Sequence, residues 1–290
     1  MHLDIKYWRT NAAVLTSRQF SNTYWDFAPG YSYVDSAAEY GYASFFYDRL
    51  GVGKSDKPDP IQTIQGPLEV EIAHVLATSL RHGQFSDNKF KKVVGAGHSF
   101  GSIITNAITQ QYPDTFDAAV LTGFGTDLSG QPLFLQALNL ALANQNQPAR
   151  FGKLNNGFLV SSTVISNQIG FFKAPGFDPA ILNQAEATKG SVTYGELNSL
   201  GGLGGLELNY TKPVAVVDGA NDLPFCSGNC TYPVDQAKAV LPKYYPNVAD
   251  EDFGSYLAPL SGHGLSFHYA AAGAYEYVQK FLVDRGLGVQ

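Results

Sequence analysis

Residues 93–102 read VVGAGHSFGS, and this stretch decides the predicted fold. An apolar run typical of a buried strand leads into Gly97-His98-Ser99-Phe100-Gly101, and a helical pattern follows from Ile103 to Tyr112. A strand, a tight turn with serine at its apex and a helix form the layout of a nucleophile elbow. The stretch therefore predicts that Ser99 is a nucleophile, although the five-residue motif alone also fits a glycine-rich loop with a solvated serine.

The rest of the chain alternates between strand-like and helix-like segments. Helical patterns occupy residues 34–40, 68–80, 103–112, 234–241 and 270–284, and strands are expected at 3–8, 12–16, 42–47, 93–97, 118–122, 214–217 and 256–260. This alternation predicts an α/β fold with a mostly parallel sheet flanked by helices. It stops between residues 126 and 210, where only 133–142 is clearly helix-like. We expect residues 1–125 and 211–290 to form the core domain and 126–210 an inserted helical cap, the alternative being an irregular surface excursion.

Composition excludes several classes of partner. The chain has 290 residues, 44% hydrophobic and 15% charged, and a formal net charge of −6. A single large domain with an insertion suits that length. The negative charge argues against binding nucleic acid or an acidic membrane surface. No window of about 18 apolar residues occurs, so no membrane-spanning helix is expected.

A base and an acid follow later strands, in the order that a serine nucleophile requires. A serine hydroxyl attacks only when a base accepts its proton and a carboxylate orients that base. His263 lies in a Gly-His-Gly loop after the last strand, and Asp222 follows the strand at 214–217. His268 competes with His263, but we interpret it as a packing or capping residue. Asp127, which follows the strand at 118–122, is the alternative acid.

The two cysteines of the chain and two glycosylation sequons favour a secretory route. Cys226 and Cys230 enclose Ser-Gly-Asn, which can turn back on itself to form a short disulfide loop. Asn209 and Asn229 each begin an Asn-x-Thr acceptor site. Two free thiols and unused sequons in the cytosol are the other interpretation. The apolar run at 12–15 is too short for a signal peptide, so secretion is expected without a leader in this sequence.

Several motifs together resemble one family. The segment DRLGVGKS at residues 48–55 resembles the Asp-x-Arg-Gly-x-Gly-x-Ser signature of the α/β-hydrolase fold family. Residues 97–101 resemble that family's elbow, and Asn221-Asp222 and Gly262-His263-Gly264 resemble its acid and base loops. The resemblance covers residues 12–286. The YWDF segment at 24–27, the cysteine pair and GHGLSFH at 262–268 are similar to secreted fungal esterases and lipases of this fold.

One departure from that family concerns the oxyanion hole. The backbone N–H of Phe100 supplies one donor directly from the elbow. The loop that supplies the other usually carries His-Gly, but counting back from residue 24 places Thr16-Ser17 there, followed by Arg18. We expect the backbone N–H of Ser17 or Arg18 to be the second donor. Removing such a donor costs about 3 kcal/mol in other enzymes.

These observations predict a serine hydrolase that cleaves a carboxylic ester or lactone through an acyl-enzyme. The reaction needs no cofactor or metal, and the aromatic, apolar cap favours a small hydrophobic substrate. Two other functions stay open: a non-catalytic ligand-binding protein whose oxyanion loop has lost turnover, and a lyase of the hydroxynitrile lyase type on the same scaffold.

Overall fold

The computed structural model describes residues 5–7, 12–17, 24–85, 89–203 and 208–288. Their centre is a seven-stranded sheet in the order β1-β3-β2-β4-β5-β9-β10. β1 is antiparallel to β3, and every other neighbouring pair is parallel. The strands are β1 (Ile5–Tyr7), β2 (Ala12–Ser17), β3 (Tyr42–Tyr47), β4 (Val93–His98), β5 (Ala118–Thr122), β9 (Val214–Gly219) and β10 (Phe253–Ala258). The predicted α/β class with a mostly parallel sheet is confirmed.

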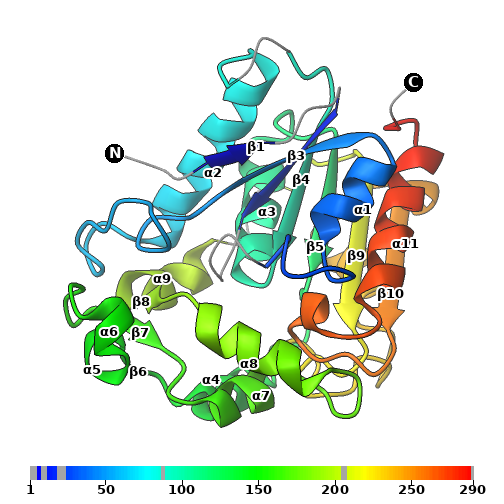
Figure 1. Ribbon diagram of the computed structural model, residues 1–290. Coiled ribbons are helices and arrows are strands. Elements are labelled where there is room, and N and C mark those ends of the chain that lie inside the picture. Colours follow the sequence, from blue (N-terminus) through cyan, green and yellow to red (C-terminus); the bar gives the residue numbers. More distant parts are fainter. Residues whose placement is uncertain (1–4, 8–11, 18–23, 86–88, 204–207, 289–290) are drawn as a thin grey trace.

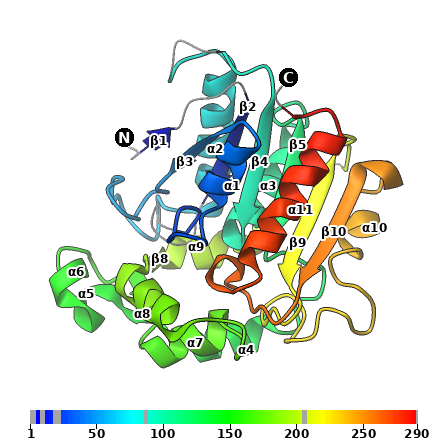
Figure 2. The ribbon, with the colours of Figure 1, turned by 45° about the vertical axis from the view of Figure 1, so that its right-hand side comes forward.

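Helices cover both faces of this sheet (Figures 1 and 2). One face carries α1 (Tyr33–Glu39) and α11 (Ala271–Asp284), and the other carries α2 (Gly66–Arg81), α3 (Phe100–Gln111) and α10 (Val240–Tyr244). Adjacent residues of one strand serve opposite layers: Val94 packs with the α1 and α11 side, whereas Val93 packs with α2 and α3. Strands buried on both faces explain the continuous apolar runs in the sequence.

The segment between β5 and β9, which we call the insertion, forms a separate layer. It contains a small antiparallel sheet in the order β6-β7-β8 surrounded by short helices. It lies at the end of the main sheet where β9 and β10 terminate (Figures 1 and 2). Its elements are α4 (Gln131–Leu138), β6 (Ala141–Leu142), α5 (Ala143–Asn146), α6 (Pro148–Phe151), β7 (Phe158–Val160), α7 (Val164–Phe171), α8 (Pro179–Thr188), β8 (Val192–Thr193) and α9 (Tyr194–Ser199).

Most predicted elements agree with the observed ones to within a few residues, and three with larger differences have a local explanation. The helix expected at 133–142 ends at Leu138, because Asn139 adopts a left-handed backbone with φ 43°. The helix expected at 234–241 is instead α10, which begins at Val240; Val234 is exposed and contributes nothing to a buried face. The last strand begins earlier than expected, at Phe253, and ends at Ala258, because the next residue, Pro259, lacks a backbone N–H.

The described residues contain neither a membrane-spanning helix nor a metal-binding cluster. None of the helices in the described ranges combines the length and the apolar character needed to cross a membrane. Within the same residues, no group of three or more His, Cys, Asp or Glu side chains is arranged to hold a metal ion.

Candidate active site

The turn between β4 and α3 holds Ser99 in a strained conformation. Its backbone lies at φ 54° and ψ −117°, a region that costs a non-glycine residue about 1–3 kcal/mol. The Ser99 N–H donates to the carbonyl oxygen of Thr122 on β5, at 2.9 Å. A Cβ on Gly97 would lie 2.3 Å from the carbonyl oxygen of Gly101, so strand and helix cross too closely for any side chain there. The structure therefore contains the predicted nucleophile elbow, with Ser99 in the turn between β4 and α3.

The structure brings Ser99, His263 and Asp222 into one hydrogen-bonded chain. The Nε2 atom of His263 lies 2.7 Å from Ser99 Oγ, and its Nδ1 atom lies 2.5 Å from Asp222 Oδ2. Ser99, His263 and Asp222 follow β4, β10 and β9. These strands are parallel, so their carboxyl ends lie on the same side of the sheet. Ser99 is 6% exposed, His263 1% and Asp222 0%. Bulk water is thus excluded from both hydrogen bonds.

Three phenylalanine rings surround the His263 imidazole. The ring of Phe171 on α7 stacks on it at 5.6 Å, and the rings of Phe134 on α4 and Phe225 lie at 5.3 and 5.8 Å. Phe134 and Phe171 belong to the insertion, and the Gly264 N–H donates to the Phe171 carbonyl oxygen at 2.7 Å. The insertion therefore packs directly on the loop that carries His263. The sequence predicts an aromatic cap, but the spacing of residues along the chain does not show that these three rings surround His263.

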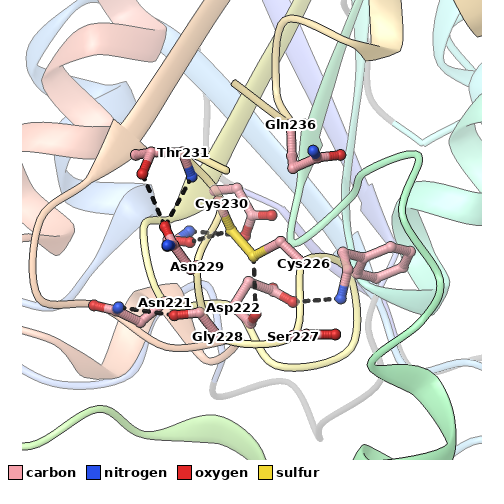
Figure 3. The surroundings of a disulfide bond; sticks show 12 residues. Asn221, Asp222, Cys226, Ser227, Gly228, Asn229, Cys230, Thr231 and Gln236 are labelled. Atoms are coloured by element: carbon pink, nitrogen blue, oxygen red, sulfur yellow. Dashed lines mark hydrogen bonds between the residues drawn. A yellow bond between two sulfur atoms is a disulfide. The ribbon is translucent and has the colours of Figure 1, made fainter. Parts of the chain in front are cut away.

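The acid loop contains the predicted disulfide. Cys226 and Cys230 are bonded, which decides between the two interpretations of the cysteine pair (Figure 3). The Phe225 N–H donates to Asp222 Oδ1 at 2.8 Å, so each carboxylate oxygen of Asp222 has a different partner. This arrangement fixes which oxygen faces His263.

A second carboxyl group is buried near Asp222. Asp218 lies near the carboxyl end of β9, and its Oδ1 accepts the Gly219 N–H at 2.7 Å. Burial, followed by the proximity of the Asp222 charge, raises the pKa of Asp218 well above its usual range. This shift favours the neutral carboxylic acid, which avoids placing two negative charges side by side in a dry environment.

His268 supports the base loop and does not face Ser99. Its Nδ1 atom donates to the Gly264 carbonyl oxygen at 2.9 Å, and its Nε2 atom accepts the N–H groups of Gly262 and Lys173 at 3.1 and 2.9 Å. Burial lowers the pKa of His268 to about 4. The neutral ring thus ties together both sides of the loop that presents His263, in agreement with its interpretation as a packing residue.

Acidification is expected to destabilise the protein through His268. The unfolded chain binds this proton near pH 6.5, whereas the folded chain binds it only near 4, so the stabilisation is present above 6.5 and is lost as the pH falls towards 4. Between pH 7 and 5 the loss is about 2 kcal/mol of unfolding free energy. Chemical denaturation across this range measures it. The His268→Gln variant should have a lower unfolding free energy than wild type at pH 7, and this free energy should fall less between pH 7 and 5. A pH dependence equal to that of wild type would contradict the assignment of the effect to His268.

Another histidine, His98, is buried beside the elbow. Its ring stacks on Tyr24 at 4.4 Å, and Nδ1 is 3.0 Å from Thr122 Oγ1. Burial, and then the proximity of His263, lowers the pKa of His98 well below its usual value. His98 therefore stays neutral and places no permanent positive charge next to the base.

The loop at residues 48–55 connects the insertion to the elbow. Arg49 forms a buried ion pair with Glu196 of α9. Its guanidinium also lies over the Phe100 ring, 4.6 Å from the centroid. Burial raises the pKa of the nearby Glu69 to about 7, with Arg49 opposing that rise. The sequence motif identified this loop, but it carried no signal that Glu196, 147 positions away, is the ion-pair partner of Arg49.

Of the expected oxyanion donors, Phe100 and Ser17 have described backbones, whereas Arg18 does not. Phe100 is the first residue of α3, where helical N–H groups have no acceptor within the helix. Ser17 ends β2, and its backbone pairs in register with Gly97 on β4. Its side chain and the whole of Arg18 lie outside the described residues, so the second donor stays a prediction.

The remaining predicted site residues are Asp127, Asn209 and Asn229. Asp127 accepts the backbone N–H of Ser129 at 2.9 Å, and the Nδ1 atom of His263 contacts Asp222 instead. Asn209 and Asn229 are both exposed. The Asn229 Oδ1 accepts the N–H and hydroxyl of Thr231, its own sequon residue. Glycan attachment at either position stays a prediction.

Comparison with known proteins defines the fold. No protein-family model matches the chain, and no curated protein sequence matches it significantly. Among solved structures, it is similar to a monoacylglycerol lipase from Paleococcus ferrophilus, with TM-score 0.65, 11% identity and coverage of 98% of this chain and 100% of that one. A thermophilic esterase from Thermogutta terrifontis matches with TM-score 0.61, 11% identity and coverage of 97% and 93%. A bromoperoxidase from Bacillus anthracis matches with TM-score 0.58, 16% identity and coverage of 97% and 96%.

Proposed function

We propose that this α/β-hydrolase-fold protein is a serine hydrolase that cleaves a carboxylic ester or lactone of a small hydrophobic substrate. The observation that carries the proposal is the buried chain of hydrogen bonds from Ser99 through His263 to Asp222. Similar structures include a lipase and an esterase, but also a bromoperoxidase, so the fold does not select the chemistry.

In the proposed reaction, Ser99 Oγ attacks the carbonyl carbon while His263 Nε2 accepts the hydroxyl proton. The Phe100 N–H donates to the developing oxyanion, and Asp222 stabilises the imidazolium through Nδ1. Collapse of the tetrahedral intermediate breaks the bond to the alcohol, which takes the proton from His263. Water, activated by the same imidazole, then hydrolyses the acyl-enzyme and regenerates Ser99.

The hydrophobic substrate follows from the surroundings of the base. Phe171 stacks on His263 and also lines a cavity of about 40 Å³ with Leu138, Leu140, Leu159 and Val160. Small-molecule sites are usually about 300–1,000 Å³, so this cavity is too small to hold a substrate as it stands, and we propose that the insertion moves when a substrate binds. Polar residues, including Ser161, Asn167 and Lys189, also line this cavity. The preference for an acyl chain or aromatic ester therefore rests on the three phenylalanine rings around His263.

We further propose that the protein acts in an oxidising, extracytoplasmic compartment. The Cys226–Cys230 disulfide and the exposed Asn209 and Asn229 support this proposal. Expression with and without a secretory leader, followed by mass measurement, tests for the disulfide and the glycans.

A fluorophosphonate probe tests the proposed chemistry. Such probes react with serine only when a base has activated it, so folded protein should gain one adduct, located on Ser99 by peptide mass spectrometry. Heat-unfolded protein and Ser99→Ala should remain unlabelled. A panel of esters of increasing chain length should then show hydrolysis, with kcat/KM rising with chain length. Folded protein that is not labelled, but binds the esters without cleaving them, would instead identify a binding protein.

A further inference from the structure

The loop closed by the Cys226–Cys230 disulfide contacts the backbone of Asp222, and the residue directly before the loop contacts the Asp222 side chain (Figure 3). The Gly228 N–H donates to the Asp222 carbonyl oxygen at 2.7 Å, and Cys226 Sγ lies 2.9 Å from the same oxygen. Phe225, the residue before the first cysteine, donates its N–H to Asp222 Oδ1 at 2.8 Å. The loop therefore holds the backbone of Asp222, and Phe225, attached directly to Cys226, holds the rotation of its carboxylate.

The far end of the loop is attached to the residues that connect β9 to Asp222. The Cys230 N–H donates to the Ala220 carbonyl oxygen at 3.0 Å. The Asn221 side-chain amide donates to the Gly228 carbonyl oxygen, also at 3.0 Å. The end of β9 and the loop thus form one compact unit, and the disulfide is its covalent closure.

Two consecutive residues of the loop have left-handed backbones. Ser227 has φ 52° and Gly228 has φ 86°. A non-glycine residue in this region is disfavoured by about 1 kcal/mol or more, so an open chain would populate other conformations. A crosslink between Cys226 and Cys230 excludes most of those alternatives. The conformation that presents the Phe225 and Gly228 N–H groups to Asp222 thus depends on the disulfide.

We propose that the Cys226–Cys230 disulfide is a positioning element for the acid of the triad, so that its reduction lowers turnover. This proposal rests on the proposed function. A dithiol supplies the two electrons: its thiolate attacks one cysteine sulfur, the S–S bond breaks, and its second thiol closes an intramolecular disulfide, leaving two cysteine thiols in the protein. The opened loop no longer holds Asp222 Oδ2 towards His263 Nδ1.

Two preparations test the proposal: wild type reduced with dithiothreitol, and the double variant Cys226→Ser with Cys230→Ser. Both should show kcat lowered about tenfold or more with KM changed less than twofold, because the loop touches the acid and not the substrate site. Since the chain has only two cysteines, titration of two thiols proves that this bond was opened. Reoxidation should restore kcat, and dithiothreitol should not affect the double variant. Full kcat with two free thiols, or in the double variant, overturns the proposal.

A double-mutant cycle separates positioning from general stabilisation. In an Asp222→Asn background, opening the loop should cause little further loss of kcat, because the carboxylate that it orients is already absent. An equal loss in both backgrounds, with a matching fall in melting temperature, would show a structural role only. If Ser99→Ala retains activity, the proposed function itself has failed, and that outcome does not depend on the state of the disulfide.

Discussion

Ser99→Ala is expected to lower kcat on an ester substrate by about 10⁶-fold, the scale seen when the nucleophile of a serine triad is removed. The reason is that Ser99 Oγ is the atom 2.7 Å from His263 Nε2, held there by the strained turn between β4 and α3. Initial rates on one ester, with active-site titration to count competent enzyme, measure the loss.

Ser102→Ala is the matched control for this substitution. Ser102 lies on α3, the helix that follows Ser99, and its hydroxyl donates to the Thr122 carbonyl oxygen, not to the base. It should retain activity within about tenfold of wild type. Comparable losses in both variants, or more than 1% of wild-type activity in Ser99→Ala, would contradict Ser99 as the nucleophile.

Asp222→Asn is expected to reduce kcat by about 10⁴-fold, because an amide in place of the carboxylate favours the wrong imidazole tautomer and cannot stabilise the imidazolium. Both Asp222 oxygens are buried and hydrogen-bonded, so the isosteric amide should keep the fold. The ratio of kcat values for the purified variants, with melting temperatures alongside, measures the effect.

Asp127→Asn is the corresponding control for the acid. Asp127 is bound to the Ser129 N–H, and loss of this exposed contact should leave kcat within about twofold. The reverse result, an inactive Asp127→Asn and an active Asp222→Asn, would require the acid to be reassigned.

Much of the fold could be predicted from local patterns. Apolar runs such as 118–122 coincide with observed strands, because strands buried on both faces leave a continuous signal in the sequence. The predicted ends of helices and strands differ from the observed ends where a single residue stops the element. Asn139 ends the helix α4 early, and Pro259 ends the strand β10. The spacing around Val234 suggested a helix, but periodicity alone does not show whether a side chain is buried.

The site shows the same division. The elbow is a short-range feature, so the glycines beside Ser99 identified it without any tertiary contact. The order Ser99, Asp222, His263 along the chain indicated the candidates, and parallel strands bring the residues that follow them to the same side of the sheet. The sequence favoured Asp222 over Asp127 as the acid only because of the loop in which it lies, after the strand at 214–217. The contact between Asp222 and His263 Nδ1 is seen only in the folded protein.

By itself, then, the sequence indicated the elbow, the alternation that produces the parallel sheet and the two cysteines available for a short disulfide loop, because each depends on residues close together in the chain. Only the tertiary structure decided that Asp222 is the partner of His263, that Phe134 and Phe171 of the insertion cover it, and that Arg49 joins Glu196 to Phe100. These contacts join residues separated by tens to more than a hundred positions. Their partners are selected by packing and burial, for which local sequence patterns carry no information.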